Sequence, residues 1–121
     1  MVHANKHTTP LFQTESGEKI YEFWGKTKSD HAKHSLAHIE VSAGQSTQKR
    51  YHPETEESLF ILNGKAKIIV DDKEYLLSPE DNIVIFPNQK VQVFNAGPSP
   101  LQYLAICIPA WTPQSEVLVD Q

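Results

Sequence analysis

Cysteine pairs, long apolar runs and excess positive charge are all missing from this sequence of 121 residues. The one cysteine, Cys107, has no partner for an intrachain disulfide. No apolar run approaches the roughly 18 residues that a membrane-spanning helix needs. The first residues, 1–7, also lack the apolar centre of a secretory signal. These absences favour a reducing, cytoplasmic setting and predict no membrane partner.

Positive charge is scarce, because 11 Lys and Arg face 15 Asp and Glu and leave a net charge of −4 with His neutral. Such a chain offers no basic stripe to neutralise phosphates, so we expect no nucleic-acid partner. Hydrophobic residues make up 39% of the chain, an ordinary share for a globular protein. The length suffices for one domain with one modest core.

Helical periodicity is missing as well, and short β-rich runs take its place. Turn residues separate roughly eight to ten such runs at intervals of about 8–12 residues, which is typical of β-sandwiches and barrels. The sequence therefore predicts an all-β fold, a single antiparallel β-barrel over residues 18–110. We expect residues 1–17 to be an N-terminal arm and residues 111–121 a C-terminal tail. The clearest runs cover residues 19–24, 35–41, 59–62, 66–70, 74–77, 83–86, 91–94 and 101–108.

Two dipeptides predict specific turns. Asn63-Gly64 separates the apolar runs 59–62 and 66–70. Asn and Gly both tolerate a positive φ, so this pair between apolar runs is a strong signal for a β-hairpin. Asp71-Asp72 predicts another turn, after residues 66–70.

Between Gly44 and Gly64 the spacing of a few residue types is more specific than the strand pattern. Gly44 is followed after five residues by Arg50, then by His52, by Glu57 after four more and by Gly64 after six more. This stretch resembles the first sequence motif of the cupin superfamily, written G-x5-H-x-H-x4-E-x6-G. The spacing fits throughout. The one departure is Arg50, which stands where the family has its first His.

A later stretch resembles the second cupin motif, G-x5-P-x-G-x2-H-x3-N, in part. Pro87 matches this motif, whereas Asp81 and Gln89 replace its glycines. Gln92 stands at the place of the family's third metal-binding His, or Val91 does if the loop is one residue shorter.

The resemblance covers about residues 35–108 and implies a small single-domain cupin, a double-stranded β-helix of the jelly-roll type that forms a homodimer. In this family two His, a Glu and a later His hold one metal ion. When the family's ligand positions are transferred to this sequence, the resemblance implies His52, Glu57 and Gln92 as candidate ligands for a divalent Fe, Mn, Ni, Cu or Zn ion. Arg50 stays protonated, has no free lone pair and repels a divalent cation. The ligand count therefore favours a site without metal.

The same substitution suits a polar or anionic small-molecule ligand. Arg50 offers a bidentate fork to a carboxylate, a phosphate or a sugar hydroxyl, and His52 and Gln92 complete the expected ligand-binding set. His52 and Glu57 are the candidate catalytic residues, because imidazole titrates near neutral pH and a nearby carboxylate also carries protons. The predicted chemistry is a metal-free isomerisation, cyclisation or elimination.

Three alternatives stay open at this point. The chain is a metal-dependent cupin enzyme of the dioxygenase or sugar-isomerase type, with His52, Glu57 and Gln92 as a reduced ligand set. It is a ligand sensor without catalysis. Or Arg50 pairs with Glu57 and only fills space.

Overall fold

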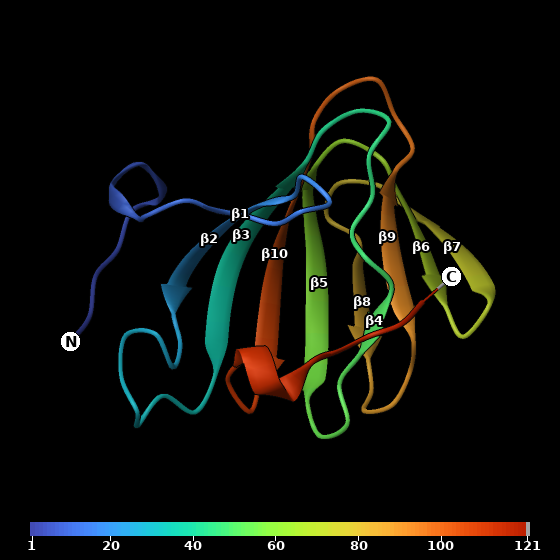
Figure 1. Cartoon of the computed structure of the whole chain (residues 1–121). Coiled ribbons are helices and arrows are strands. Elements are labelled where there is room, and N and C mark those ends of the chain that lie inside the picture. Colours follow the sequence, from blue (N-terminus) through green and yellow to red (C-terminus); the bar gives the residue numbers. More distant parts are fainter. Residues whose placement is uncertain (121) are drawn as a thin grey trace.

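The computed structural model describes residues 1–120, which form two antiparallel β-sheets packed face to face (Figure 1). The six-stranded sheet has the order β1 (Phe12–Gln13), β2 (Lys19–Trp24), β3 (Ser35–Val41), β10 (Leu101–Ile108), β5 (Glu56–Asn63) and β8 (Asn82–Ile85). The five-stranded sheet has the order β11 (Val117–Leu118), β4 (Arg50–Tyr51), β9 (Val91–Asn95), β6 (Ala66–Val70) and β7 (Lys73–Leu77). Two 3₁₀ turns, η1 (Lys6–Thr8) and η2 (Pro113–Ser115), flank the strands.

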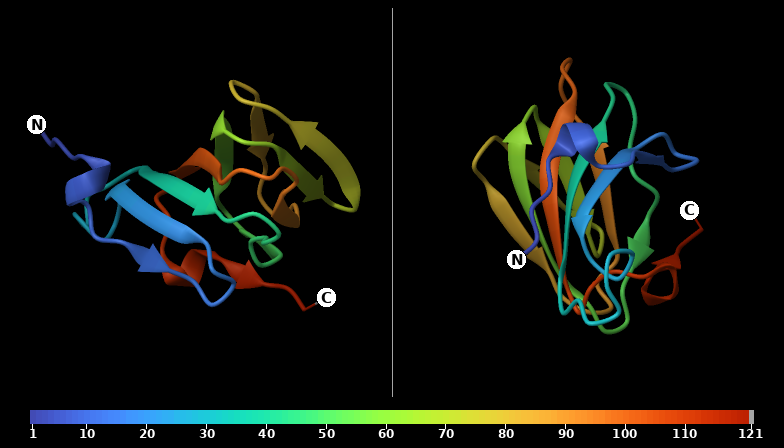
Figure 2. Two further views of the ribbon diagram at one scale, coloured as in Figure 1. Left: turned by 90° about the horizontal axis from the view of Figure 1, so that it is seen from above. Right: turned by 90° about the vertical axis from the view of Figure 1, so that its left-hand side faces the viewer.

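This architecture confirms the predicted all-β jelly roll, with one difference. The strands of the described chain do not close into a ring, because the hydrogen-bonded ladders end at β1 and β8 in one sheet and at β11 and β7 in the other. Figure 2 shows the two sheets as separate layers when seen from above. Side chains from both inner faces therefore build the core, as in a sandwich.

The core lies between the sheets and follows the two-residue period of the strands. Strand β10 lies between β3 and β5, as its apolar sequence predicts for a central strand. Residues 101–107 of this strand alternate between buried and half-buried, and the last residue, Ile108, is exposed. The buried apolar cluster consists of Ile39, Val41, Leu59, Ile61, Ala66, Ile68, Val70, Leu77, Ile85, Val91, Val93, Leu101, Tyr103 and Ala105.

The hairpin predicted at Asn63-Gly64 is wrong, because this turn carries the chain from one sheet to the other. Strand β5 pairs with β10 and β8, whereas β6 pairs with β7 and β9. Asn63 Nδ2 donates to the carbonyl oxygen of Pro100 at 3.1 Å. A Cβ on Gly64, whose φ is +87°, would lie 2.8 Å from the same oxygen. This close packing makes the turn a corner between the layers.

A two-residue hairpin does occur at Asp71-Asp72, where β6 turns into β7. Val70 and Lys73 are the last cross-strand partners, and both aspartates have positive φ, at 48° and 68°. Two positive φ values in a row define the turn whose twist matches the flanking strands.

Both ends of the chain add strands to the sheets. In the arm, β1 pairs with β2, and in the tail, β11 pairs with β4. Figure 1 shows the tail running from η2 in front of β5 towards β4. No helix within residues 1–120 is long and apolar enough to cross a membrane.

Candidate functional site

Three of the residues predicted for the site lie together between the sheets. Arg50, in β4, and His52, directly after it, are two positions apart, so their side chains share one face of the backbone. Glu57 lies near the start of β5. All three are buried, with 7%, 2% and 4% of Arg50, His52 and Glu57 exposed.

Arg50 is held by carboxylates on two sides of its guanidinium. Its Nη2 donates to both carboxylate oxygens of Glu57, at 3.1 and 3.4 Å. Its Nε lies 3.2 Å from Oε1 of Glu116, and its Nη1 lies 3.4 Å from the hydroxyl of Thr47. Burial opposes the positive charge, but these acids, Glu57 foremost, hold the pKa of Arg50 above its ordinary value. Arg50 is therefore a permanent cation whose main donors are already engaged.

His52 is a neutral imidazole with one unsatisfied nitrogen. Its Nε2 is buried without a hydrogen-bond partner and lies 3.7 Å from Oε1 of Glu116. Burial, helped by Arg50, lowers the pKa of His52 against the opposing effect of Glu57 and Glu116. The contact with Glu116 is therefore not an ion pair at neutral pH, and Nε2 is positioned to exchange a proton with a ligand.

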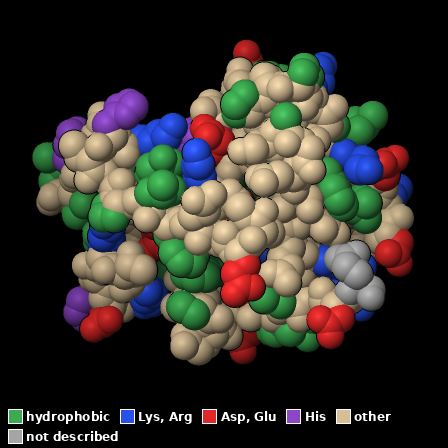
Figure 3. Space-filling view, turned by 45° about the horizontal axis from the view of Figure 1, so that its top comes forward, with side chains coloured by type: hydrophobic (Ala, Val, Ile, Leu, Met, Phe, Trp, Pro, Cys, Tyr) green, Lys and Arg blue, Asp and Glu red, His purple; other side chains and the backbone are tan. Residues whose placement is uncertain are grey.

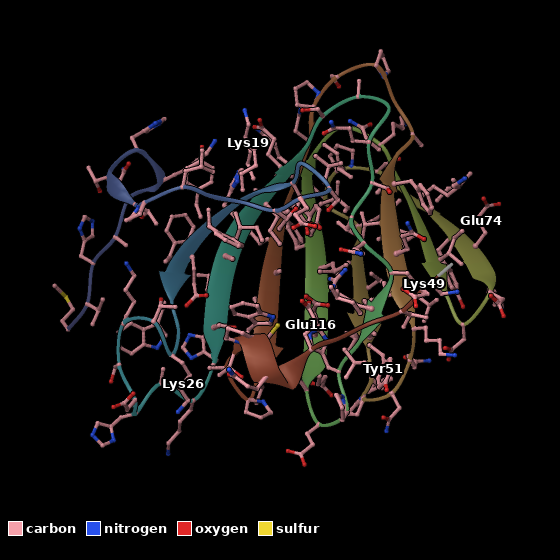
Figure 4. All side chains as sticks on the ribbon, viewed as in Figure 1. Lys19, Lys26, Lys49, Tyr51, Glu74 and Glu116 are labelled. Carbon is pink, nitrogen blue, oxygen red and sulfur yellow. The ribbon has the colours of Figure 1, made fainter. Side chains whose placement is uncertain are left out.

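Glu116 is a member of the site that the sequence analysis left in the tail. The residues after it, Val117 and Leu118, pair with Tyr51 and Arg50 of β4. This pairing brings Glu116 to Arg50, and Figure 4 shows its side chain on the tail in front of β5. The short apolar run at residues 117–119 could have predicted a strand after Glu116. The sequence around this run does not indicate that the strand pairs with β4. We call Arg50, His52, Glu57 and Glu116 the polar cluster.

Glu18 is a third acid near the guanidinium that the sequence analysis missed. It precedes β2 and is half-buried. Burial raises the pKa of Glu18, and Arg50 lowers it in opposition, while Glu116 and Glu57 add to the rise. The site thus combines three carboxyl groups with one guanidinium.

Tyr103 and Cys107, both from β10, add weakly acidic groups beside the cluster. Tyr103 is fully buried, and its hydroxyl has no hydrogen-bond partner within the described structure. Burial raises the pKa of Tyr103, and Glu18 adds to the rise. The thiol of Cys107 lies 3.7 Å from Oε2 of Glu57, and burial raises its pKa as well. Both groups are protonated at neutral pH and act as donors rather than nucleophiles.

Gln92 is not brought together with the other predicted site residues. Its neighbours Val91 and Val93 face the core, so Gln92 points to the opposite side of β9. There its amide donates to the hydroxyl of Ser46 at 3.3 Å and to the carbonyl of Thr47 at 3.0 Å. Val91 is the inward residue, opposite Arg50 in the ladder.

The donor set does not fit the metal that the cupin resemblance implies. Of the four ligand positions, one holds the cation Arg50 and another the apolar Val91. Glu57 has both oxygens engaged by Arg50, which leaves His52 as the one unengaged ligand of the family pattern. Among the described residues no group of three or more His, Cys, Asp or Glu is arranged to hold a metal ion. A transition-metal site needs at least three such ligands.

Comparisons with known proteins show which family model and which relatives this chain matches. A family model described as the cupin domain matches residues 37–107. An uncharacterised protein from Methanocaldococcus jannaschii is 26% identical over 107 residues, which are 88% of this chain and 86% of that protein.

Solved structures show the same fold at low sequence identity. The nucleoside dehydratase Pac13 from Streptomyces has a TM-score of 0.81 at 13% identity and covers 98% of this chain and 91% of its own. An oxalate decarboxylase from Lactobacillus farciminis, in a formate complex, has a TM-score of 0.80 at 21% identity. That match covers 93% of this chain and 34% of the decarboxylase.

Proposed function

The chain belongs to the cupin domain family, and from that premise we propose that its polar cluster binds a small, neutral, hydroxyl-bearing molecule. We further propose that the cluster acts on this ligand by acid–base chemistry without a metal. The observation that carries the proposal is the surplus of acid. Two carboxyl groups, Glu57 and Glu116, contact the one guanidinium of Arg50, and the charge of Arg50 also acts on the half-buried Glu18.

The surplus of acid favours a neutral ligand over an anionic one. Arg50 already donates to Glu57 and pairs with Glu116, so an incoming carboxylate or phosphate meets an engaged guanidinium and excess negative charge. Hydroxyl groups, in contrast, find carboxylate acceptors on several sides. Of the polar and anionic ligands expected from the sequence, the polar neutral class is the better match.

His52 is the proposed base. Its neutral Nε2, which has no hydrogen-bond partner, takes a proton from a carbon or hydroxyl of the ligand. In an elimination, the electron pair of that C–H bond forms a double bond as the C–O bond of the neighbouring hydroxyl breaks. The leaving oxygen takes the proton that His52 has accepted and departs as water, so His52 ends the step neutral again. Glu57 holds Arg50 in place, and in an isomerisation the proton held by His52 returns to another atom of the ligand.

One structural relative acts on a molecule of this class. Pac13 is a nucleoside dehydratase, and structures of it contain uridine, a neutral molecule with several hydroxyl groups. At 13% identity this likeness extends to the fold alone. The proposal for the present chain therefore rests on its own carboxyl groups and on His52.

Matched pairs of ligands test the proposal. Isothermal titration calorimetry compares uridine with uridine 5′-monophosphate, and glucose with glucose 6-phosphate. We expect the neutral member of a pair to bind and its phosphorylated partner to bind more weakly or not at all. Binding of phosphorylated members alone would overturn the choice of a neutral ligand.

Turnover is tested separately with every neutral compound that binds. Mass spectrometry detects loss of water, and chromatography detects isomers. We expect His52→Gln to abolish turnover while circular dichroism shows an intact fold. A protein that binds these compounds and converts none of them is a sensor, which contradicts the catalytic part of the proposal.

A further inference from the structure

Three members of the polar cluster, Arg50, His52 and Glu57, are buried, although they are the groups that a ligand has to reach. His52 is buried, and so is the guanidinium of Arg50 that pairs with Glu57. A ligand of even a few atoms cannot reach Nε2 of His52 while these side chains are covered. A segment of the chain has to move before anything binds.

The C-terminal tail is the segment that contacts both buried residues from outside. Glu116 reaches Arg50 and His52 with the same carboxylate oxygen, Oε1, at 3.2 and 3.7 Å. The side chain of Glu116 is itself 23% exposed, so it is the member of the cluster nearest to solvent. Its place in the tail lets one carboxylate close the site.

Apart from Glu116, a small number of contacts hold this segment in place. At its start, the half-buried Trp111 donates its amide N–H to Oγ of Ser35 at 3.0 Å. Further along, β11 pairs with β4 at two positions, and the amide of Val119 donates to the carbonyl of Lys49 at 2.9 Å. Val117 and Leu118 are 37% and 55% exposed, so the tail buries little apolar surface there. Segments with few buried apolar contacts open at low free-energy cost.

Open space lies along the flank of the tail. A shallow, open pocket of about 550 Å³ is lined by Tyr51, Asn88, Lys90 and residues 117–120. By contrast, β10 is paired along its length with β3 and β5. Separating those strands breaks many more hydrogen bonds than releasing β11.

We propose that residues 111–120 form a strap that closes the polar cluster, with the Glu116–Arg50 ion pair as its latch, and that ligands enter when the strap opens. The role of the cluster as a ligand site rests on the proposed function. The opening itself belongs to the unliganded protein and is measured without any ligand.

Acylation of histidine by diethyl pyrocarbonate reports the opening directly, because the reagent modifies neutral, accessible imidazoles. Peptide mass spectrometry resolves each site. His3, His7, His31 and His34 are exposed and serve as references for full reactivity. Figure 3 shows histidine side chains on the surface at the left of the molecule, the side on which the N-terminal arm lies in Figure 1. The buried His38 is the reference for protection.

Removing the latch charge is the first perturbation. We expect Glu116→Gln to speed modification of His52 by roughly three- to tenfold, the range for losing one partly exposed charged hydrogen bond. Glu54→Gln, which removes an exposed acid outside the cluster, is the matched control and should leave the rate unchanged. His38 should stay protected in both variants. Equal rates for Glu116→Gln and the control would overturn the latch.

Locking the strap is the second perturbation. Tyr51 and Val117 are directly opposite in the antiparallel ladder, where Cα atoms lie about 4.5–5.5 Å apart, a separation that a disulfide spans. We expect the double variant Tyr51→Cys/Val117→Cys to protect His52 when oxidised and to expose it again when reduced. Each single variant controls for the loss of Tyr51 or Val117. Equal modification of the locked and reduced forms would place the entrance elsewhere.

The Tyr51→Cys/Val117→Cys variant also tests the strap and the proposed substrate class independently of each other. If the locked protein excludes diethyl pyrocarbonate but no neutral compound binds the reduced form, the strap stands and the proposed substrate class fails. If uridine binds the locked and reduced forms equally fast, the strap fails and the substrate class stands.

Discussion

Arg50 and Glu57, seven positions apart in the chain, form a buried ion pair in which one nitrogen of the guanidinium contacts both oxygens of the carboxylate. The pair occupies two of the four places where other cupins hold a metal. A buried salt bridge therefore stands at two positions where the family motif has metal ligands.

Breaking this pair from one side should destabilise the fold strongly. In Arg50→Met the carboxylate of Glu57 stays buried without its cation, which costs about 3–5 kcal/mol of the free energy of unfolding. The double variant Arg50→Met/Glu57→Gln should recover a large part of that loss, since no uncompensated charge remains between these two residues. Guanidinium denaturation of the wild type, both single variants and the double variant measures the coupling. Additivity within about 0.5 kcal/mol would contradict a coupled pair.

Metal content should depend on the two positions where this chain departs from the cupin ligand set. We expect the wild type, purified without a histidine tag, to carry far less than one metal ion per chain. Arg50→His combined with Val91→His restores the family's ligand types on the inner face and should take up about one ion. Inductively coupled plasma mass spectrometry decides this, with the single variant Arg50→His as the intermediate control. Stoichiometric metal in the wild type would revive the metal-dependent alternative.

His52 should titrate below 6.5, its ordinary value. Because burial lowers its pKa in the folded state, its contribution to stability is complete above pH 6.5 and falls as the pH drops towards the folded pKa. Glu116→Gln should lower the pKa of His52 further, since the carboxylate of Glu116 favours the imidazolium. NMR titration of the ring protons measures both values. A higher pKa in Glu116→Gln would contradict the contact between the two residues.

Glu18 should make the fold less stable at neutral pH than an uncharged residue does. Burial raises its pKa in the folded state, so its contribution to stability is complete below 4.5, its ordinary value, and is lost as the pH rises through the folded pKa. Glu18→Gln should therefore raise the melting temperature at pH 7, with the difference shrinking towards pH 4. Calorimetry at both pH values checks this. The exposed Glu15→Gln is the control, and a shift of equal size there would argue against a local effect.

Tyr103→Phe should weaken ligand binding without lowering the free energy of unfolding. The buried hydroxyl has no partner in the unliganded fold, so removing it should leave the free energy of unfolding unchanged or raise it by up to about 1 kcal/mol. The same variant should weaken ligand binding, because a donor beside the cluster is lost. A loss of about 1 kcal/mol or more in urea denaturation would show that the hydroxyl is a structural hydrogen-bond donor instead.

Much of the fold follows from patterns that are local in the sequence. Every predicted run lies within or next to an observed strand, because alternation of side chains and turn residues act over a few positions. The corner at Asn63-Gly64 was misread as a hairpin, since the same dipeptide suits a turn between sheets when Pro100 packs against it. The homodimer implied by the family stays a prediction.

The resemblance to the first cupin motif placed Arg50, His52 and Glu57 in one site, and a spacing of two along a strand explains why Arg50 and His52 share one face. The sequence left the register of the second motif open, and the ladder opposite Arg50 shows that Val91 faces inward and Gln92 outward. Only the tertiary structure shows that Glu18 and Glu116 belong to the surroundings of Arg50. Their nearness to Arg50 comes from strand pairing between distant segments, and such pairing depends on how the whole core packs rather than on the residues beside each acid.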